Sequence, residues 1–310
     1  MDVLSSPVYG GEIGSIATVR ALIQGIRLQH WVKNLLLAAP LVLAHQFDNS
    51  ESIRACIGAI IVFSLSSSAM YLINDLLDLE NDRRHPQKCK RPLAAGKIST
   101  NISIATSILF IVASLTISLF TINPTFIIYL CIYIFIAILY SKIIKKVAFI
   151  DAIIVTSFYI LRILAGGCAC SIPVSGSLLG FATLFFLCIV LAKRYGEIRL
   201  QMRVGRIEKA VYMLIHTGYV RKLGILTGVA ANTVLCAYIT SPAASAQYSM
   251  PLLLFLWVPL LVVWMIRMWR LLGRERYTID PIVFALSDPV SLLLGIGMLV
   301  TYLGASGALI

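Results

Sequence analysis

The sequence predicts an all-α protein that crosses a membrane several times. Of its 310 residues, 59% are hydrophobic, and the mean hydropathy of +0.90 lies far above that of a soluble domain. Several stretches of about 18 to 22 residues carry no charge, which is long enough for a helix to cross a bilayer. Lys and Arg gather in every second connection between these stretches. Together these observations exclude a soluble globular protein. They also exclude nucleic acid as an expected partner, because no soluble domain is present to bind it.

The elements are expected in the following order. Residues 1–30 form an N-terminal tail and an interfacial helix, because apolar residues from Ile13 to Leu28 alternate with Arg20, Gln24 and Arg27. Residues 31–310 form a single transmembrane domain. Its nine spans are expected at about 31–47, 53–73, 101–121, 124–141, 148–167, 177–193, 223–240, 250–268 and 285–305.

The basic residues predict an orientation for these spans. All but two of the 26 Lys and Arg residues precede or begin the first span, or lie at the end of an even-numbered span or in the loop after it, and the exceptions are Arg54 and Arg162. By the positive-inside rule, the N-terminus is expected in the cytoplasm and the C-terminus outside. The expected location is a bacterial inner (cytoplasmic) membrane. The net charge of +12 then lies on the cytoplasmic face, where it favours a phosphorylated soluble substrate.

An acidic stretch at the end of the second span is the centre of the predicted site. If the helix continues, Asp75, Asp78 and Asp82 fall at i, i+3 and i+7 on one face, with Asn74 beside them. Like charges at this spacing repel one another unless a cation lies among them. Hard oxygen ligands of this kind suit Mg²⁺. The alternative is a solvated, charged helix end.

Cations follow the acids in the sequence. Pro86 is expected to end the helix near His85. Beyond that point the chain can turn back, so that Lys88 and Arg91 reach toward a phosphate bound at the acids.

Three further polar clusters lie at span ends. Trp31–Asn34 begins the first span, Tyr140–Lys146 precedes Asp151 between spans four and five, and Lys193–Glu197 ends the sixth. Each also has a simpler explanation as interfacial anchors, positive-inside charge or a helix-surface pair. Asp151 and Arg162 lie near or within the membrane, three helical turns and about 16 Å apart, so they can face one cavity without pairing. The alternative for Arg162 and Asp151 is a structural ion pair with another span.

Two smaller patterns predict packing and turns. Gly166 and Gly167 predict a close approach between helices. Asp280–Pro281 and Asp288–Pro289 predict turns and helix caps.

The motif N-D-x-x-D-x-x-x-D, followed by D-R-x-H-P-x-K-x-x-R-P, resembles the UbiA superfamily of intramembrane prenyltransferases. The patterns Trp31–Asn34, Tyr140–Asp151 and Lys193–Glu197 are similar to those of one branch, the decaprenyl-phosphate phosphoribosyltransferases. The second aspartate box of the aromatic prenyltransferases, D-x-x-x-D, is incomplete here, because Val155 stands where its second acid would be. The resemblance implies nine transmembrane helices around a central cavity that opens to the cytoplasm.

The resemblance also implies a magnesium-dependent pentosyltransferase, with Mn²⁺ as a substitute metal. Such an enzyme transfers 5-phosphoribose from phosphoribosyl diphosphate (PRPP) to a polyprenyl phosphate, for cell-envelope glycan synthesis. The expected partners are PRPP, polyprenyl phosphate and the membrane, and a homo-oligomer is compatible with the sequence. The alternatives are an aromatic polyprenyltransferase, with an acceptor such as 4-hydroxybenzoate, and a transporter.

In this interpretation Asp75, Asp78 and Asp82 are the catalytic residues, and with Asn74 they hold the metal and the diphosphate. The substrate-binding candidates are the cations and their polar neighbours: Lys33, Asn34, Asn74, Arg83, His85, Lys88, Arg91, Tyr140, Lys145, Asp151, Arg162, Lys193, Arg194 and Glu197. The division of these side chains between the two phosphorylated substrates stays open.

Overall fold

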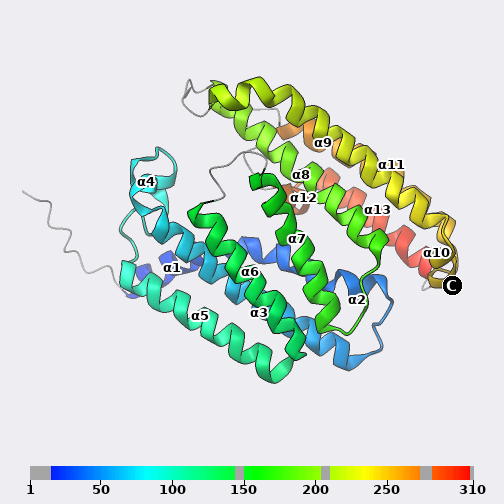
Figure 1. The fold of residues 1–310 in the computed structure, drawn as a ribbon, viewed down its shortest axis with the longest axis horizontal. Helices are drawn as coiled ribbons and strands as arrows, with labels where there is room; N and C mark the ends of the chain where they lie inside the picture. The colour runs from blue at the N-terminus through cyan, green and yellow to red at the C-terminus, as the bar shows by residue number, and fades with distance from the viewer. Residues whose placement is uncertain (1–14, 144–149, 204–209, 273–280, 308–310) are drawn as a thin grey trace, which may run out of the picture. The chain divides into compact units, whose positions relative to one another are not determined.

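The computed structural model describes residues 15–143, 150–203, 210–272 and 281–307. Within these residues every regular element is a helix, as the composition predicts (Figure 1). Eight of the described helices are long and apolar enough to cross a membrane. The chain is therefore an all-α, multi-pass membrane protein, and the predicted fold class is confirmed.

The elements are given in chain order, with η marking a 3₁₀ helix. They are α1 (Ser15–Ile26), η1 (Leu28–Ala38), α2 (Ala39–Leu43), α3 (Ser50–Leu77), α4 (Leu79–Arg84), η2 (Lys88–Lys90), α5 (Thr100–Thr121), α6 (Pro124–Lys142), α7 (Ile150–Ala169), α8 (Gly176–Arg203), α9 (Ala210–Ile239), α10 (Pro242–Gln247), η4 (Pro251–Leu256), α11 (Trp257–Leu272), α12 (Pro281–Ser287) and α13 (Pro289–Ser306).

Eight of the predicted spans correspond to the long helices, and the remaining one, at residues 31–47, is built differently. It consists of η1 followed by α2, with Pro40 in the first turn of α2. A 3₁₀ helix rises by about 2.0 Å per residue, so η1 and α2 end to end reach about 30 Å, the thickness of the hydrocarbon core of a bilayer. The extended 3₁₀ geometry thus lets a short segment cover the distance of a full span.

The described chain forms two compact units. Unit 1 consists of residues 15–28 and 65–114, and unit 2 consists of residues 29–64 together with the described residues from 115 onward. Helices α3 and α5 each contribute residues to both units. The predicted boundary between an N-terminal tail and a transmembrane domain at residue 30 stays a prediction.

Serine side chains form hydrogen bonds between the helices of unit 1. The Ser66 hydroxyl in α3 donates to Ser114 Oγ in α5 at 2.9 Å, and the Ser68 hydroxyl donates to the backbone carbonyl of Ile26, at the end of α1, at 3.0 Å. Small hydroxylated residues let membrane helices approach closely and satisfy hydrogen bonds across the contact. As a result, the end of α1 lies beside α3.

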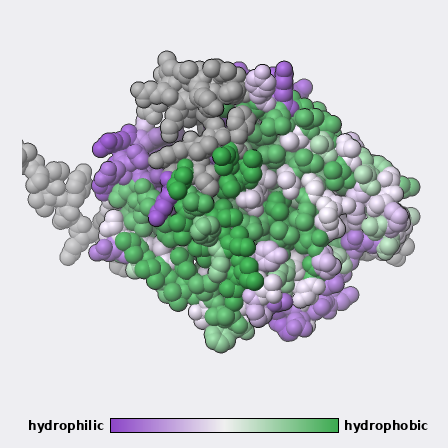
Figure 2. Space-filling view, in the orientation of Figure 1, coloured by the Kyte–Doolittle hydropathy of each residue, from purple (hydrophilic) through white to green (hydrophobic). Residues whose placement is uncertain are grey.

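Unit 2 is organised around α8, which packs against α7, α9 and α11. Its main core contains Phe186, Ile189 and Met268, and the Tyr159 ring stacks on Phe186 with centroids 4.5 Å apart. Figure 2 shows hydrophobic side chains, in green, over the outer face of α6 and α7. An apolar outer face is what a bilayer requires of helices that cross it.

The close approach predicted from Gly166 and Gly167 is confirmed. A Cβ atom added at Gly166 would lie 2.0 Å from the carbonyl oxygen of Leu37, and one at Gly167 would lie 2.4 Å from a methyl group of Val174. Only glycine leaves room for the η1 backbone to pass so near α7. This contact brings η1 within reach of the polar side chains of α7.

Candidate functional site

The acidic cluster of unit 1 contains Asp75 and Asp82, which pair with Arg27 and Arg91, and Asp78 lies between the two acids in the sequence. Asp75 is only 3% exposed and Asp82 only 2%. Arg91 Nη1 lies 3.0 Å from Asp75 Oδ1 and 2.6 Å from Asp82 Oδ2, and Arg27 Nη2 lies 2.6 Å from Asp75 Oδ1. Two buried carboxylates thus share one guanidinium, which offsets the repulsion that their spacing predicts.

The helix through this motif is broken once, although the sequence predicts a continuous one. It ends at Leu77 and resumes at Leu79, and Asp78 between them has φ −98° and ψ 4°. The backbone N–H of Asp78 still donates to the Asn74 carbonyl at 3.0 Å, and that of Asp82 to the Asp78 carbonyl at 2.8 Å. These i to i+4 bonds largely preserve the helical spacing of the acids.

The end of α4 follows the prediction made from Pro86. The helix ends at Arg84, and His85 has the extended backbone, φ −91° and ψ 131°, that a following proline imposes. His85 Nδ1 accepts the backbone N–H groups of Gln87 and Lys88 at 3.2 and 3.3 Å. Through Nδ1, His85 shapes the turn that carries the chain back toward the acids.

The structure brings Arg91 to the acids, whereas Arg83 and Lys88 are exposed and form no ion pair with them. Arg27 also contacts them, and sequence reasoning missed it, because 48 residues separate Arg27 from Asp75 and no local pattern links them. Its backbone has φ 55°, in the left-handed region that arginine rarely adopts. Its guanidinium lies 5.0 Å from the centre of the Tyr71 ring.

The donor atoms of this cluster suit Mg²⁺. Asp75 and Asp82 contact the same guanidinium nitrogen, so a single cation can bridge the two carboxylates. Among the described residues, no three His, Cys, Asp or Glu side chains are grouped as a metal site would require. Arg27 and Arg91 engage oxygens of Asp75 and Asp82 that a metal would use. Asp75 and Asp82 are the residues that would hold a divalent ion, in competition with Arg91.

A network of four side chains joins α6, α7 and α8 in unit 2. The Tyr140 hydroxyl donates to Asp151 Oδ1 at 2.6 Å, and Arg194 Nη2 donates to the same oxygen at 2.9 Å. Arg194 Nε lies 2.6 Å from Asp151 Oδ2, and its Nη1 lies 2.5 Å from Glu197 Oε2. Asp151 is 8% exposed and has both oxygens engaged. The structure therefore brings together residues predicted from two separate motifs.

Arg162 forms a different cluster of unit 2, on α7. It is 4% exposed, and its Nε donates to Asn34 Oδ1 at 2.8 Å. Its Nη1 donates to the Phe158 carbonyl at 2.7 Å, and its Nη2 lies 3.5 Å from the Tyr133 hydroxyl. Asn34 in turn donates to Ser64 Oγ at 3.0 Å, so its side chain is oriented from both ends.

No carboxylate among the described residues pairs with Arg162, and as predicted it does not pair with Asp151. A buried guanidinium without an acid is costly in a protein interior, and more so within a membrane. Its contacts are all to neutral oxygens, and a guanidinium has five N–H donors, so donors remain for another acceptor. Arg162 is therefore the strongest candidate in unit 2 for binding an anion.

The remaining predicted cations are placed less specifically. Lys33 is half-buried in η1 next to Asn34, and Lys193 is half-buried in α8 next to Arg194. Lys145 lies outside the described residues. The roles of these lysines stay predictions.

Asp288 has the capping role that its position before Pro289 predicts. Its carboxylate accepts the Ser291 backbone N–H at 2.9 Å at the start of α13, and Arg267 Nη2 donates to it at 2.8 Å. The hydrogen bond from Arg267 holds the pKa of Asp288 low, at about 2. Asp280, the other predicted turn residue, lies outside the described residues.

Comparison with known sequences gives three matches that bear on this site. A family model, the UbiA prenyltransferase family, matches residues 35–288. A decaprenyl-phosphate phosphoribosyltransferase of Mycobacterium tuberculosis is 34% identical over 223 residues, which cover 70% of this chain and 72% of that protein. An uncharacterised protein of Sinorhizobium fredii is 30% identical over 281 residues, which cover 89% of this chain, and the chain spans about half of that relative's length.

Comparison with solved structures gives the same fold. A UbiA homolog from Archaeoglobus fulgidus, solved with DMAPP and Mg²⁺ bound, superposes with a TM-score of 0.65 over 91% of this chain and 99% of that one. The two are 15% identical, so this likeness shows the fold alone.

Proposed function

Since the chain belongs to the UbiA prenyltransferase family, as its acidic motif predicts, we propose that it transfers 5-phosphoribose from PRPP to a polyprenyl phosphate and releases diphosphate. The Mycobacterium tuberculosis relative, a decaprenyl-phosphate phosphoribosyltransferase, supports this choice of branch. The proposal includes a role in cell-envelope glycan synthesis. It places the reaction on the cytoplasmic side of a bacterial inner membrane, as the positive-inside charge pattern favours.

The observation that carries the proposal is the pairing of Asp151. Both of its oxygens are engaged, by Arg194 and by Tyr140, and Val155 stands where a second acid would complete the box. A second metal-bound diphosphate would need free carboxylates at this place. Because Arg194 and Tyr140 already engage Asp151, this place suits a substrate that is held without a second metal ion.

We assign the metal and the leaving diphosphate to the acidic cluster of unit 1, with Asp75, Asp78, Asp82 and Asn74 as ligands. When bound, Mg²⁺ would take negative charge off the departing diphosphate. Arg91 contacts both buried acids, so displacement from them would leave its guanidinium beside the metal, ready to bind a phosphate oxygen.

In the proposed reaction an oxygen of the lipid phosphate forms a bond to C1 of the ribose. The bond between C1 and the diphosphate oxygen breaks, and its electron pair leaves with the diphosphate. The lipid phosphate is already an anion at pH 7, so no strong base is needed, and the role of the chain is to position the reactants. Arg162, oriented by Asn34, is assigned to one phosphate group.

A second candidate function is transfer of a prenyl group to an aromatic acceptor such as 4-hydroxybenzoate. It is kept as an alternative because the Archaeoglobus fulgidus protein, which shares the fold, was solved with DMAPP and Mg²⁺ bound. The incomplete second box in this chain argues against it. We set the transporter alternative aside because the family is one of transferases.

The test offers both classes of donor to the purified full-length protein. In one reaction, labelled PRPP is incubated with polyprenyl phosphates of several chain lengths, and in the other a labelled prenyl diphosphate is incubated with 4-hydroxybenzoate. We expect label from PRPP to enter the lipid extract only when Mg²⁺ is present, and a parallel reaction shows whether Mn²⁺ replaces it. Prenylation of 4-hydroxybenzoate without ribosyl transfer would overturn the proposal in favour of the second candidate.

A further inference from the structure

A cavity of about 410 Å³ lies in unit 2, away from the network around Asp151. It is formed by α2, the segment before α8, the start of α8, the end of α9, the segment from α10 to η4 and the start of α11. On α8, Phe181 lines the cavity and Arg194 belongs to the charged network. These two residues are about 20 Å apart along the helix. The cavity is therefore separate from the network around Asp151, and neither Asn34 nor Arg162 lines it.

The lining of the cavity is apolar, with a few neutral polar groups. Its apolar surface includes Leu43, Phe181, Leu235, Leu254 and Trp257, and no described lining residue carries a charge. The volume falls within the range of small-molecule sites. A lining of this kind excludes a phosphate or carboxylate as the bound group and favours a hydrocarbon chain.

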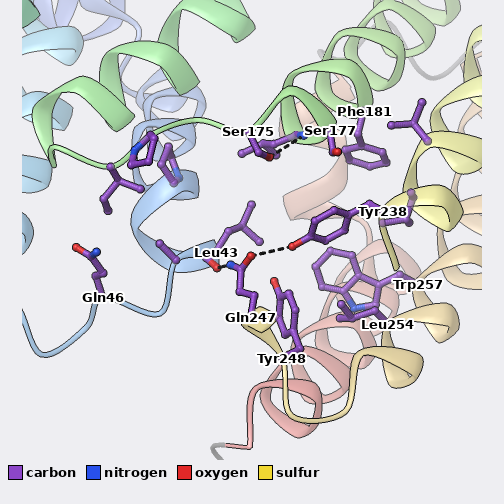
Figure 3. A pocket seen from close by; sticks show the side chains of 17 residues that line it. Leu43, Gln46, Ser175, Ser177, Phe181, Tyr238, Gln247, Tyr248, Leu254 and Trp257 are labelled. Atoms are coloured by element: carbon purple, nitrogen blue, oxygen red, sulfur yellow. Dashed lines mark hydrogen bonds between the residues drawn. The ribbon is translucent and has the colours of Figure 1, made fainter. Parts of the chain in front are cut away.

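Most polar groups around the cavity already have partners. The Tyr238 hydroxyl donates to Gln247 Oε1 at 2.8 Å, and Gln247 Nε2 donates to the Leu43 carbonyl (Figure 3). Gln46 and Gln247 are exposed at the edge of the cavity, which therefore reaches the protein surface there. The Tyr238 hydroxyl and the Gln247 side chain therefore already have partners within the protein.

Tyr248 is the one buried polar residue among those that line the cavity. It is 5% exposed, and Figure 3 shows its hydroxyl directed toward the cavity beside Gln247. Within the described part of the chain this hydroxyl has no hydrogen-bond partner. Burial raises the pKa of Tyr248 above its ordinary value, so the group stays a protonated donor at neutral pH. A hydroxyl directed into the cavity can donate to an acceptor that enters from outside the protein.

The Tyr248 ring is held in place by His45, which in turn packs on Tyr302. His45 packs edge-on against Tyr248, with centroids 5.1 Å apart and an interplanar angle of 80°. His45 also stacks on Tyr302, whose hydroxyl donates to the Val42 carbonyl. The donor of Tyr248 is thus preorganised, which lowers the entropic cost of binding an acceptor.

We propose that this cavity binds a lipid hydrocarbon chain that carries an uncharged oxygen, and that this oxygen accepts a hydrogen bond from Tyr248. The proposal goes beyond ribosyl transfer and does not depend on it. Two sources offer the same chemistry, namely an ester carbonyl of a bilayer phospholipid and the hydroxyl of an isoprenoid alcohol. The cavity has no cation for a phosphate, so the phosphate of the lipid substrate is not expected to bind in it.

The experiment maps photo-crosslinks on the full-length protein in nanodiscs. One arm uses a phosphatidylcholine with a diazirine in its acyl chain, and the other uses a polyprenol with a diazirine near its hydroxyl. In the wild-type protein we expect adducts on the segments 173–181 and 247–257 from at least one probe, and the probe that labels them identifies the source.

Two matched pairs of variants test the site. Val234→Phe fills the cavity, and Val229→Phe places the same ring on an exposed position of the same helix. We expect Val234→Phe to lower labelling at least about tenfold, the loss expected when two methylene groups can no longer be buried. Tyr248→Phe removes only the hydroxyl, and Tyr129→Phe on α6 is its control. We expect Tyr248→Phe to raise the half-saturating probe concentration about 2- to 12-fold, as loss of one hydrogen bond does.

Each result decides the proposal. Loss of labelling in Val234→Phe and weaker binding in Tyr248→Phe, with both controls like wild type, supports it. Wild-type labelling of these segments no stronger than that of the exposed face of α9 would overturn it. The proposal would also be overturned if a variant and its matched control were labelled equally. If Val234→Phe does not fold, the Tyr248→Phe and Tyr129→Phe pair is sufficient to support or overturn the proposal.

Discussion

The two acidic clusters of the molecule balance their charge in different ways. In unit 1, Asp75 and Asp82 are both almost fully buried and share the Arg91 guanidinium. In unit 2, Asp151 is a single buried acid whose two oxygens are taken by Arg194 and Tyr140.

This difference indicates which cluster can exchange its cation. Two carboxylates around one nitrogen atom offer at least two oxygen ligands to any cation that replaces Arg91, which is how proteins commonly hold Mg²⁺. In unit 2, Arg194 contacts Asp151 and the more exposed Glu197 through different nitrogen atoms, so no single nitrogen joins two carboxylates there, and metal binding would break these contacts. We therefore expect mutations in unit 1 to change metal dependence, and mutations in unit 2 to change substrate binding or stability.

The largest effect is expected for Asp75→Asn, which removes one of the two shared carboxylates. We expect transfer activity to fall at least about 100-fold, the scale for loss of a positioned electrostatic group, and the half-saturating Mg²⁺ concentration to rise. Steady-state assays across a Mg²⁺ series measure both quantities, and a thermal melt checks the fold. Glu80→Gln, an exposed acid of α4, is the matched control. If Asp75→Asn turned over at the wild-type rate, the assignment of the metal to this cluster would be wrong.

A smaller effect is expected for Arg162→Lys, which keeps the charge and loses the forked geometry that contacts Asn34 and Phe158. We expect kcat/KM to fall about 10- to 100-fold, as for loss of a hydrogen bond to a charged group. The KM of one phosphorylated substrate should rise, while the half-saturating Mg²⁺ concentration stays the same. Arg54→Lys, at an exposed position of α3, serves as the control. If the kinetics of Arg162→Lys were unchanged, Arg162 would have only a structural role and would not bind a substrate phosphate.

Asp151→Asn is expected to act mainly on stability. The Arg194 side chain is 25% exposed, so solvent screens part of the loss, and we expect the free energy of unfolding to fall by about 1 to 3 kcal/mol. Chemical denaturation in detergent micelles measures it. The Mg²⁺ dependence of the variant should match wild type. A shift as large as that of Asp75→Asn would mean that Asp151 also binds metal, and the contrast between the clusters would fail.

The smallest effect is expected for Asp288→Ala. This variant serves as a reference, because the pair of Asp288 and Arg267 has only a structural role. Loss of the cap should lower the free energy of unfolding by about 0.5 to 2 kcal/mol at neutral pH. The folded-state pKa of about 2 lies below the ordinary 3.8, so this contribution is complete above pH 3.8 and is lost as the pH falls toward 2. Melting temperatures of both proteins between pH 6 and pH 2 should converge at the acid end. If the difference in melting temperature stayed constant with pH, the stabilisation would not come from the charge of the Asp288 carboxylate.

Local patterns in the sequence determined much of this protein. Uncharged stretches of span length predicted the membrane helices, and their boundaries follow from residues such as Pro86, which ends α4, and Asp288, which begins α13. The Gly166–Gly167 pair predicted a close contact. These features depend on hydrogen bonds and steric limits within a few residues, so a linear pattern is enough to reveal them.

The partners of the charged side chains were decided only by the tertiary structure. Arg27 reaches Asp75 across 48 residues, and Arg162 finds Asn34 across 128. The cavity that the Tyr248 hydroxyl faces exists only because α2, α9 and η4 pack around it. The sequence shows which residues can carry charge or donate a hydrogen bond. Which of them meet depends on how closely helix backbones approach, and that distance is set by side chains from segments far apart in the chain.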